Sequence, residues 1–264
     1  KAAKKVGIHF EKHVFSGDEP QSAIMARIQE LNGRDDIHGM IVQVPLPKHY
    51  EEDIIIAQMD PNKDADGFHQ ANLRAILSGE PRIIPAVALA IVALVDEACL
   101  TQRSAALHVP LSGRPDAPEQ SSVRGRQDPA LQNLQNKKAL IIANRLEFAA
   151  PIEYLLEKQG ALVHIMLRQK EMTPDAIAQL RDADIVVVAR GHANFVSGDM
   201  FKDGAIVIDV GTNKLLNGRV VGDVDVDSTH TKKGFITPVP GGVGPMTVAM
   251  LLKNTLELAK ASQK

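Results

Sequence analysis

Two stretches, GMIVQVPLP and KDADGF, carry amide and acidic side chains suited to binding a flat heteroaromatic ligand. Gln43 ends the apolar run of the first stretch, and Asp64 and Asp66 precede Gly67 in the second. A carboxylate accepts two parallel N–H bonds from the edge of an amino-heterocycle, which gives strong and directional recognition. Aspartates in loops also cap turns very often, so each aspartate taken alone is better explained as a turn or capping residue.

A third stretch, TPVPGGVGPMT at residues 237–247, mixes prolines and glycines in a way that neither a helix nor a strand interior tolerates. Its glycines leave backbone N–H groups bare directly before a helix, VAMLLKNTLELAK. Such a backbone makes a concave surface against which a flat ligand can lie. A purely structural turn rarely needs PGGVGP, so here a functional role is favoured.

Composition restricts the possible partners. The 264 residues suffice for two modest domains, and the formal net charge of −2 provides no basic field for nucleic acid or an anionic membrane. Seven Phe, two Tyr and no Trp argue against a base-stacking surface. The one cysteine, Cys99, forms no intrachain disulfide and is expected to be a small core hydrophobe.

The remaining sequence signals predict a protein without metal or membrane span. The longest apolar run, residues 83–95, suits a buried helix because it is short for a bilayer. The histidines show no metal-ligand spacing, since His9 and His13 fall in a strand-like or loop context. We predict a soluble protein of a reducing compartment, cytoplasmic, with the mitochondrial matrix as the alternative. The start, KAAKKVGI, lacks an initiator Met and leads us to expect a preceding segment.

The first part of the chain predicts helices mixed with strands. Residues 18–32 have helical spacing with Asp18 as a candidate N-cap, and the mostly apolar helix 83–98 is entered through Pro85. The other predicted elements are strands at 6–15 and 37–44 and a short helix at 50–58. Residues 101–136, rich in Gln, Ser, Arg and Pro, are predicted to be an exposed connector or insertion.

After residue 136 strands and helices alternate. The predicted strands are 138–144, 161–167, 183–191 and 204–211, and the predicted helices are 151–160 and 173–183. Alternation of this kind is typical of a parallel sheet with helices on its faces, and the continuous Val and Ile runs suit strands buried on both sides. Ligands of such sheets bind beside the first strand-to-helix turn, where strands end.

That first turn, ANRLEFAAP at 143–151, is a weak dinucleotide motif. Glycines normally let backbone N–H groups approach a pyrophosphate, and this turn has Ala143, Ala149 and Ala150, whose methyl groups would hold phosphate away. At the end of the second strand stands Arg168, where an arginine favours a 2′-phosphate. The alternative for Arg168 is a solvated charge at a strand end.

Together these segments resemble the methylenetetrahydrofolate dehydrogenase/cyclohydrolase family. The resemblance rests on TPVPGGVGPMT, GMIVQVPLPKH, PNKDADGFHQAN, and GAIVIDVG with GDVDV. It implies an α/β fold of two lobes, a substrate-binding α/β domain and a Rossmann-like parallel-sheet dinucleotide-binding domain. We expect the folate domain at 1–100 plus 245–264, the connector at 101–136 and the dinucleotide domain at 137–244.

The resemblance also implies roles. The family oxidises the methylene bridge of a folate with a nicotinamide and then hydrolyses the methenyl product, here with NADP expected and NAD as the alternative. Gln43 matches the glutamine that steers the catalytic lysine, and Asp66 matches the aspartate that holds the pterin edge. The implied substrate-binding residues are Val42, Gln43, Val44, Asp66, Pro240, Gly241, Gly242, Val243 and Gly244. The implied cofactor-binding residues are Ala143, Asn144, Arg145, Arg168, Thr212 and Thr237. A tetrahydrofolate-type substrate and a homodimer are expected.

Several departures from the family pattern keep alternatives open. The family's catalytic tyrosine and lysine would precede Lys1, and Lys1, Lys4 and Lys5 do not take over that role. Its Gly-Arg-Ser turn reads Ala143-Asn144-Arg145, its later glycine is Ala149, and its Pro-Cys-Thr-Pro reads Pro85-Ala86-Val87-Ala88. The alternatives are a degenerate homologue that binds folate or a partner subunit without redox turnover, and a protein that keeps only the cyclohydrolase step.

Overall fold

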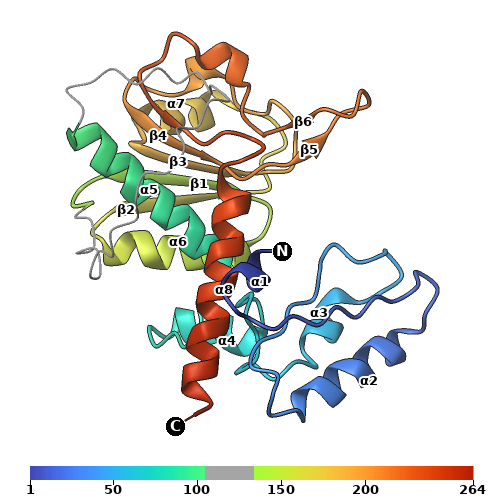
Figure 1. Ribbon diagram of the computed structural model, residues 1–264. Helices are drawn as coiled ribbons and strands as arrows, with labels where there is room; N and C mark the ends of the chain where they lie inside the picture. The colour runs from blue at the N-terminus through green and yellow to red at the C-terminus, as the bar shows by residue number, and fades with distance from the viewer. Residues whose placement is uncertain (105–133, 264) are drawn as a thin grey trace. The chain divides into compact units, whose positions relative to one another are not determined.

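The computed structural model describes residues 1–104 and 134–263, which divide into two compact units (Figure 1). Unit 1 comprises Lys1–Ala90 and Met246–Lys264, and unit 2 comprises Ile91–Pro245. The boundaries fall within two long helices, α5 (Ala86–Ser104) and α8 (Val243–Ala261). The first boundary lies earlier in α5 than the predicted residue 100.

Unit 2 is built on a five-stranded parallel sheet in the order β2-β1-β3-β4-β7. Its strands are β1 (Lys138–Ala143), β2 (Leu162–Leu167), β3 (Ile185–Ala189), β4 (Ala205–Asp209) and β7 (Gly234–Ile236). The helices α6 (Leu146–Lys158) and α7 (Pro174–Asp182) connect them, and β5 (Asn213–Lys214) pairs with β6 (Val220–Val221) in a separate ribbon. Short 3-10 turns, η1 (Gly198–Met200) and η2 (Val226–Thr229), complete the unit. The predicted parallel sheet and α/β class are confirmed.

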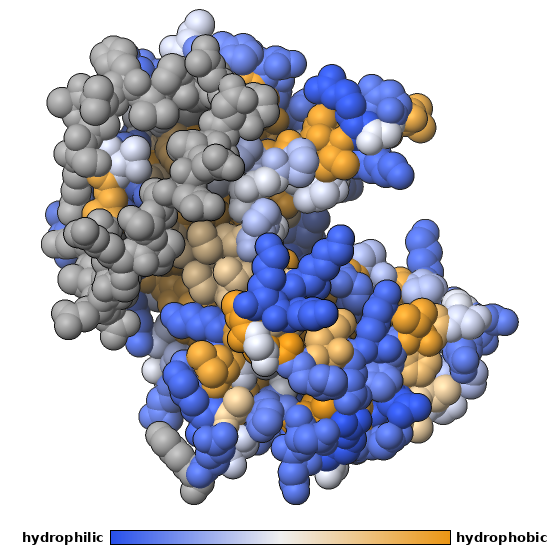
Figure 2. Space-filling model, in the orientation of Figure 1, coloured by the Kyte–Doolittle hydropathy of each residue, from blue (hydrophilic) through white to orange (hydrophobic). Residues whose placement is uncertain are grey.

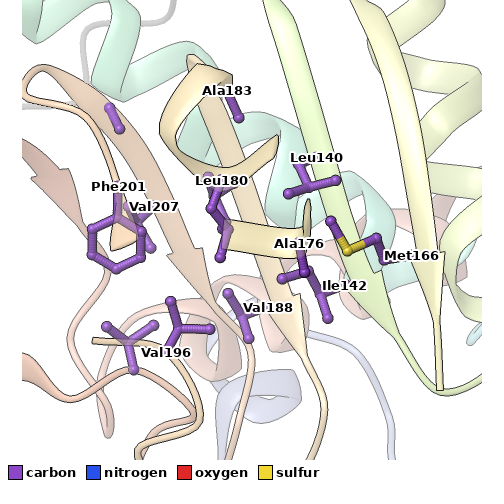
Figure 3. Close-up of a cluster of buried hydrophobic side chains, with 13 residues drawn as sticks. Leu140, Ile142, Met166, Ala176, Leu180, Ala183, Val188, Val196, Phe201 and Val207 are labelled. Carbon is purple, nitrogen blue, oxygen red and sulfur yellow. The ribbon is translucent and has the colours of Figure 1, made fainter. Parts of the chain in front are cut away.

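Helices cover both faces of this sheet, as the continuous apolar runs require. Figure 3 shows Leu140 and Ile142 of β1 and Val188 of β3 on the face that α7 covers with Ala176 and Leu180. Neighbouring strand residues point to the opposite face. There Ile141, Val187 and Ile208 are fully buried, on the side of the sheet where Figure 1 shows α5 and α6.

Unit 1 is helical in the residues that the structure describes. Its helices are α1 (Ala2–Lys5), α2 (Gln21–Asn32), α3 (Glu52–Ile56), α4 (Gln70–Leu77) and the parts of α5 and α8 within its bounds. The predicted strands at 6–15 and 37–44 are wrong, because the described part of this unit offers no ladder partner beyond one isolated bridge between Met40 and Asp64. Helix α2 begins at Gln21 with Pro20 as its N-cap, so Asp18 is not the cap; its carboxylate accepts a hydrogen bond from Ser16.

The segment 6–15 begins with a turn, has no regular secondary structure after it, and is held by side chains instead of a sheet. Val6, Phe10 and Val14 are 61%, 63% and 74% exposed, which no core strand would be. The guanidinium of Arg34 donates to both carboxylate oxygens of Glu11, at 3.0 and 2.8 Å, and lowers the pKa of that carboxyl. Figure 2 shows hydrophilic residues over most of the visible surface of unit 1, with apolar residues in separate patches.

The predicted connector at 101–136 differs from the structure at both ends. Thr101–Ser104 complete α5, and Leu134 is 1% exposed, with its N–H donating to the carbonyl of Gln159 at 2.8 Å. Residues 105–133 lie outside the described part.

Cys99 is half-buried in α5. Across residues 1–104 and 134–263, none of the helices combines the length and apolar character needed to cross a bilayer.

A poorly satisfied polar pair lies between α5 and α6. The amide Nε2 of Gln159 donates to Oδ2 of Asp96 at 3.5 Å. Within the described residues, Asp96 Oδ1 and Gln159 Oε1 have no hydrogen-bond partner. Burial raises the pKa of Asp96 to about 6, partly offset by the bond from Gln159. The folded protein therefore binds a proton at Asp96 more tightly than the unfolded chain does. This tighter binding stabilises the fold at low pH, and the stabilisation is lost as the pH rises from about 4 to about 6.

We expect Asp96→Asn to raise the free energy of unfolding at about pH 8 by about 1 kcal/mol, a value reduced for solvent screening at a half-buried site. An asparagine carries no charge and offers Gln159 Oε1 a donor. Near pH 4 the gain should shrink, because the wild-type carboxyl is protonated there. Urea unfolding at both pH values measures this, with exposed Glu97→Gln on the same helix as control. A gain that is equal at both pH values would contradict the assignment.

Candidate functional site

The KDADGF loop of unit 1 is organised by Asp64, which is 1% exposed. Its Oδ1 accepts the N–H of Gly67 at 2.9 Å. Its Oδ2 accepts the N–H of His69 at 2.8 Å and Nδ2 of Asn72 at 3.0 Å. The turn-capping interpretation of Asp64 is therefore confirmed, because this carboxylate is used within the loop.

Two neighbours of Asp64 fix the loop against the rest of unit 1. Lys63 Nζ donates to the carbonyls of Leu31, Asn32 and Arg34, at 3.2, 2.8 and 2.6 Å, and so satisfies the C-terminus of α2. Gly67 has φ +86°, and a Cβ there would lie 2.7 Å from Cα of Pro85. Only glycine fits this position. The sequence indicated no role for Lys63.

Asp66 is the member of this loop that remains available to a ligand. It is half-buried, and its side chain has no hydrogen-bond partner among the residues described. Burial, with a smaller contribution from the charge of Asp64, raises the pKa of Asp66 to about 6. A partly desolvated carboxylate without a partner favours a ligand that brings N–H donors.

The Gln43 stretch lies beside this loop. Met40 N–H donates to the carbonyl of Lys63 at 2.6 Å, and Ala65 N–H donates to the carbonyl of Met40 at 3.1 Å. Val42 packs on the apolar cluster of unit 1, whereas Gln43 is exposed and, among the described residues, donates only to the carbonyl of Val44, at 3.0 Å. The structure thus brings the two predicted segments together and leaves Gln43 and Val44 on the surface.

The glycine-proline loop belongs to unit 2 up to Pro245. Gly241 has φ +114°, and a Cβ on Gly242 would lie 2.7 Å from the carbonyl oxygen of Pro238, so both positions require glycine. Helix α8 already begins at Val243, so Val243 and Gly244 lie in its first turn. Pro240 and Gly241 remain in the loop that precedes the helix.

Thr237 faces the interior of unit 2. It is 1% exposed, and its Oγ1 accepts the N–H of Asp209 at 2.8 Å. The same hydroxyl donates to the carbonyl of Asp209 at 3.3 Å. The side chain predicted to contact the cofactor is therefore used to join β7 to β4. Thr212, the other predicted threonine, is exposed after β4.

The first strand-to-helix turn is shorter than predicted. Ala143 ends β1 and α6 begins at Leu146, so the turn consists of Asn144 and Arg145, and Pro151 lies inside the helix. Ala143 and Ala149 are 0% exposed, which places their methyl groups in the protein interior. The expectation that these methyl groups hold phosphate away from the turn is wrong.

A cavity of about 720 Å³ opens at this turn. It is lined by Asn144, Arg145, Leu146, Glu147, Leu167 and Arg168. The structure thus unites three of the predicted cofactor residues, Asn144, Arg145 and Arg168, at the carboxyl ends of β1 and β2. Nε of Arg145 lies 3.6 Å from Oε2 of Glu147. The cavity carries two guanidinium groups and one carboxylate, a lining that suits an anionic ligand.

Sequence reasoning missed Arg190, which follows β3 at the same edge. Its Nη1 donates to Oδ1 of Asn144 at 2.6 Å, and Nδ2 of Asn144 returns a bond to the carbonyl of Arg190 at 2.9 Å. Its Nε donates to the carbonyl of Gln169. The available signal was an arginine directly after the apolar run of ADIVVVARG.

Two buried aspartates hold the loops at this edge. Asp209 accepts the N–H groups of Gly211, Asp223 and Val224, and burial raises its pKa to about 6 in spite of these bonds. Asp223 is 0% exposed and accepts four donors. These are N–H of Arg190, Gly191 and His192, and Nδ2 of Asn213, at 2.6, 2.9, 2.9 and 2.8 Å. GDVDV thus carries a structural carboxylate that the sequence left unassigned.

Comparison with known proteins matches both units to one family. Residues 1–66 match the catalytic domain of tetrahydrofolate dehydrogenase/cyclohydrolase, and residues 128–263 match its NAD(P)-binding domain. The chain belongs to the tetrahydrofolate dehydrogenase/cyclohydrolase family. The bifunctional protein FolD of Nitrosomonas eutropha is 38% identical over 256 residues, covering 97% of this chain and 75% of the relative. FolD of Campylobacter fetus is 40% identical over 248 residues, covering 94% and 75%.

Solved structures of this family share the fold. FolD of Campylobacter jejuni superposes with a TM-score of 0.80 at 33% identity, over 98% of this chain and 80% of that one. The Trypanosoma brucei enzyme, solved with NADP cofactor and inhibitor, gives 0.77 at 31%, over 100% and 80%. The predicted family is thereby confirmed.

Within the described residues, His, Cys, Asp and Glu form no group of three that could hold a metal.

We expect Asp223→Asn to destabilise unit 2 by about 2–4 kcal/mol. Whichever way the amide turns, its NH₂ group faces N–H donors that the carboxylate now accepts. Amide hydrogen exchange at Gly191 and His192 should accelerate accordingly. The control is Asp227→Asn, whose side chain is 93% exposed. Unchanged protection of those two amides would show that Asp223 does not hold the loop.

Proposed function

We propose that this chain catalyses NADP-dependent oxidation of 5,10-methylenetetrahydrofolate to 5,10-methenyltetrahydrofolate and hydrolysis of that product to 10-formyltetrahydrofolate. The family membership, the FolD relatives and the NADP-bound Trypanosoma brucei enzyme support both reactions. The structural observation that carries the proposal is Asp66, a half-buried carboxylate without a side-chain partner in the described residues, on a loop built to present it.

In this proposal Asp66 binds the pterin. Its two oxygens accept N–H groups from the amino edge of the ring, and Asp64 is already occupied within the loop. Gln43 offers its amide beside this loop, and Val42 and Val44 flank it. For Pro240 and Gly241 of unit 2, a role in substrate binding rests on the resemblance, and glycine leaves their backbone without a side chain at position 241.

The residues present fit a dinucleotide. NADP, when bound, supplies the hydride acceptor. Its binding residues in this proposal are Asn144, Arg145 and Arg168, which line the cavity where β1 and β2 end. The first N–H groups of α6 have no hydrogen-bond partner within the helix. Together with the helix dipole, they attract an anion to this end of α6. Thr212 remains a candidate contact, and Thr237 acts indirectly by fixing the chain after β7.

A degenerate homologue without redox turnover is not favoured. That alternative rested on alanines that would keep phosphate from the first turn, and the methyl groups of Ala143 and Ala149 are buried away from the cavity. The alternative of cyclohydrolase activity alone rested on the same substitutions. The cavity with its two guanidinium groups therefore supports a dehydrogenase step that uses a dinucleotide.

The direct test measures NADPH formation from 5,10-methylenetetrahydrofolate and NADP. Two proteins are compared: the 264-residue chain, and the same chain preceded by the N-terminal segment of the Nitrosomonas eutropha relative, in which the resemblance leads us to expect the family's tyrosine and lysine. We expect both proteins to form NADPH, with faster turnover in the extended protein. A folded extended protein that gives no turnover with NADP or NAD would refute the proposed function.

Asp66 gives a binding test that does not need turnover. We expect Asp66→Asn to weaken tetrahydrofolate binding roughly tenfold or more, because a charge-assisted acceptor is lost. Since only the ionised carboxylate accepts both N–H groups and its pKa is about 6, wild-type affinity should be flat above about pH 7 and fall roughly tenfold by pH 5. Calorimetric titration at several pH values measures both effects.

The control for this test is Asp35→Asn, an exposed aspartate of unit 1. It should leave the affinity and its pH dependence unchanged. If Asp66→Asn keeps the wild-type pH profile, the titrating group is not Asp66 and the pterin contact is assigned wrongly.

The resemblance further supports a homodimer assembled through unit 2, which sedimentation equilibrium would test.

A further inference from the structure

We propose that Asn254 of α8 is a positioning residue for the substrate, because its buried amide holds the backbone on which Asp66 is presented to the pterin. The inference rests on the proposed function, since it concerns how that carboxylate is aimed at its ligand. Asn254 and its partners all belong to unit 1. The bond from Asn254 to Ala65 joins residues 189 positions apart, so no local sequence pattern predicts it.

The amide of Asn254 joins two segments of unit 1. Its side chain is 5% exposed. Nδ2 donates to the carbonyl of Ala65 at 2.9 Å and to the carbonyl of Ile84 at 3.0 Å. An amide NH₂ group carries two hydrogens, so these two bonds use its full donor capacity. Since both partners are acceptors, the nitrogen of the amide, and not its oxygen, must face them.

Both of these bonds lead to Asp66. Ala65 directly precedes it, so the first bond fixes the chain on the N-terminal side of the aspartate. The second bond fixes Ile84, and two residues later Ala86 donates its N–H to the main-chain carbonyl of Asp66 at 3.0 Å. Asn254 therefore holds the backbone of Asp66 from two sides, once through its neighbour and once through the segment that binds its own carbonyl.

The packing of α8 makes these bonds hard to replace. Leu258, one helical turn after Asn254, is 6% exposed and packs with Ala65 and Ile83 in one apolar cluster. Ala65 itself is 2% exposed, so water has little access to its carbonyl. Removing the amide of Asn254 would leave a buried acceptor unsatisfied, and the loop would have to move to satisfy it.

Asp66 depends on this support because its side chain has no hydrogen-bond partner among the described residues. Its backbone alone therefore sets where the carboxylate lies. Two parallel N–H bonds from a ring edge require both carboxylate oxygens at fixed positions, so a small shift of the backbone loses one bond. Asp64, by contrast, is held by the donors of its own loop.

The first experiment is calorimetric titration of the 264-residue chain and its variants with tetrahydrofolate. Asn254→Leu keeps the branched shape of the side chain and removes both donors. We expect it to weaken tetrahydrofolate binding roughly tenfold, because the loop that presents Asp66 loses two of its fixed points. Asn254→Ser keeps one donor and should lie between this variant and the wild type. NADP affinity, which the proposed function assigns to unit 2, should not change.

Asn32→Leu is the matched control within unit 1. Nδ2 of Asn32 donates to the carbonyl of Gln58 at 2.7 Å, so this variant removes the same kind of bond between α2 and the residues after α3. Tetrahydrofolate affinity should be unchanged in Asn32→Leu. Urea unfolding compares the loss of stability in the two variants and shows whether each of them is folded.

A double-mutant cycle separates positioning from a general loss of structure. The second background is Asp66→Ala, in which the carboxylate is gone. If Asn254 acts through Asp66, Asn254→Leu should change tetrahydrofolate affinity by less than roughly twofold in that background. A general loss of structure would weaken binding by the same factor in both backgrounds.

The outcomes separate this inference from the proposed function. Unchanged tetrahydrofolate affinity in folded Asn254→Leu, or a loss that is equal in both backgrounds, overturns the role of Asn254 and leaves the proposed function intact. An equal loss of NADP affinity overturns it as well. If Asn254→Leu does not fold, Asn254→Ser is carried through the same cycle. A wild type that does not bind tetrahydrofolate refutes the pterin site itself, and the inference falls with it.

Discussion

The loops at the carboxyl edge of the sheet are held by hydrogen bonds from their backbone N–H groups to two buried carboxylates. Parallel strands leave their following loops without ladder partners, and buried donors must be satisfied. Asp209 and Asp223 provide the acceptors, and Asp209 also donates its own N–H to Thr237. Because Asp223 fixes the main chain of Arg190, it also places the guanidinium that holds Asn144. The cavity at the first turn therefore depends on a carboxylate that does not line it.

Unit 1 uses a similar arrangement with a different outcome. Of the two aspartates in KDADGF, Asp64 is used for the N–H groups of its own loop. That leaves its neighbour Asp66 close to a buried charge and partly out of water, and both effects raise the pKa of Asp66. A ligand with N–H donors relieves this cost. In the proposed pterin site, Asp64 is therefore used within its own loop, and Asp66, which has no side-chain partner in the described structure, remains for the ligand.

The parallel sheet of unit 2 could be predicted because its strands are continuous Val and Ile runs, which identify themselves without knowledge of their partners. The strand expected at 37–44 has a similar run but lacks a partner ladder in the described residues, and pairing is not encoded locally. Pro151 suggested a helix start, yet α6 begins at Leu146 and accommodates the proline inside. The engagement of Asn144 by Arg190 joins residues far apart in sequence, so only the fold reveals it.

The departures of the cofactor turn from the family pattern are best explained together. Asn144 stands in place of the family's arginine, but the turn keeps a cation in Arg145, and Arg168 and Arg190 lie at the same edge. Asn144 is short enough to exchange bonds with Arg190, and this pair joins the ends of β1 and β3. Positive charge therefore lies at this edge both in the turn and at the ends of β2 and β3. Recognition of an anion depends on where donors and charge lie in space, so a substitution at the motif position does not by itself remove the site.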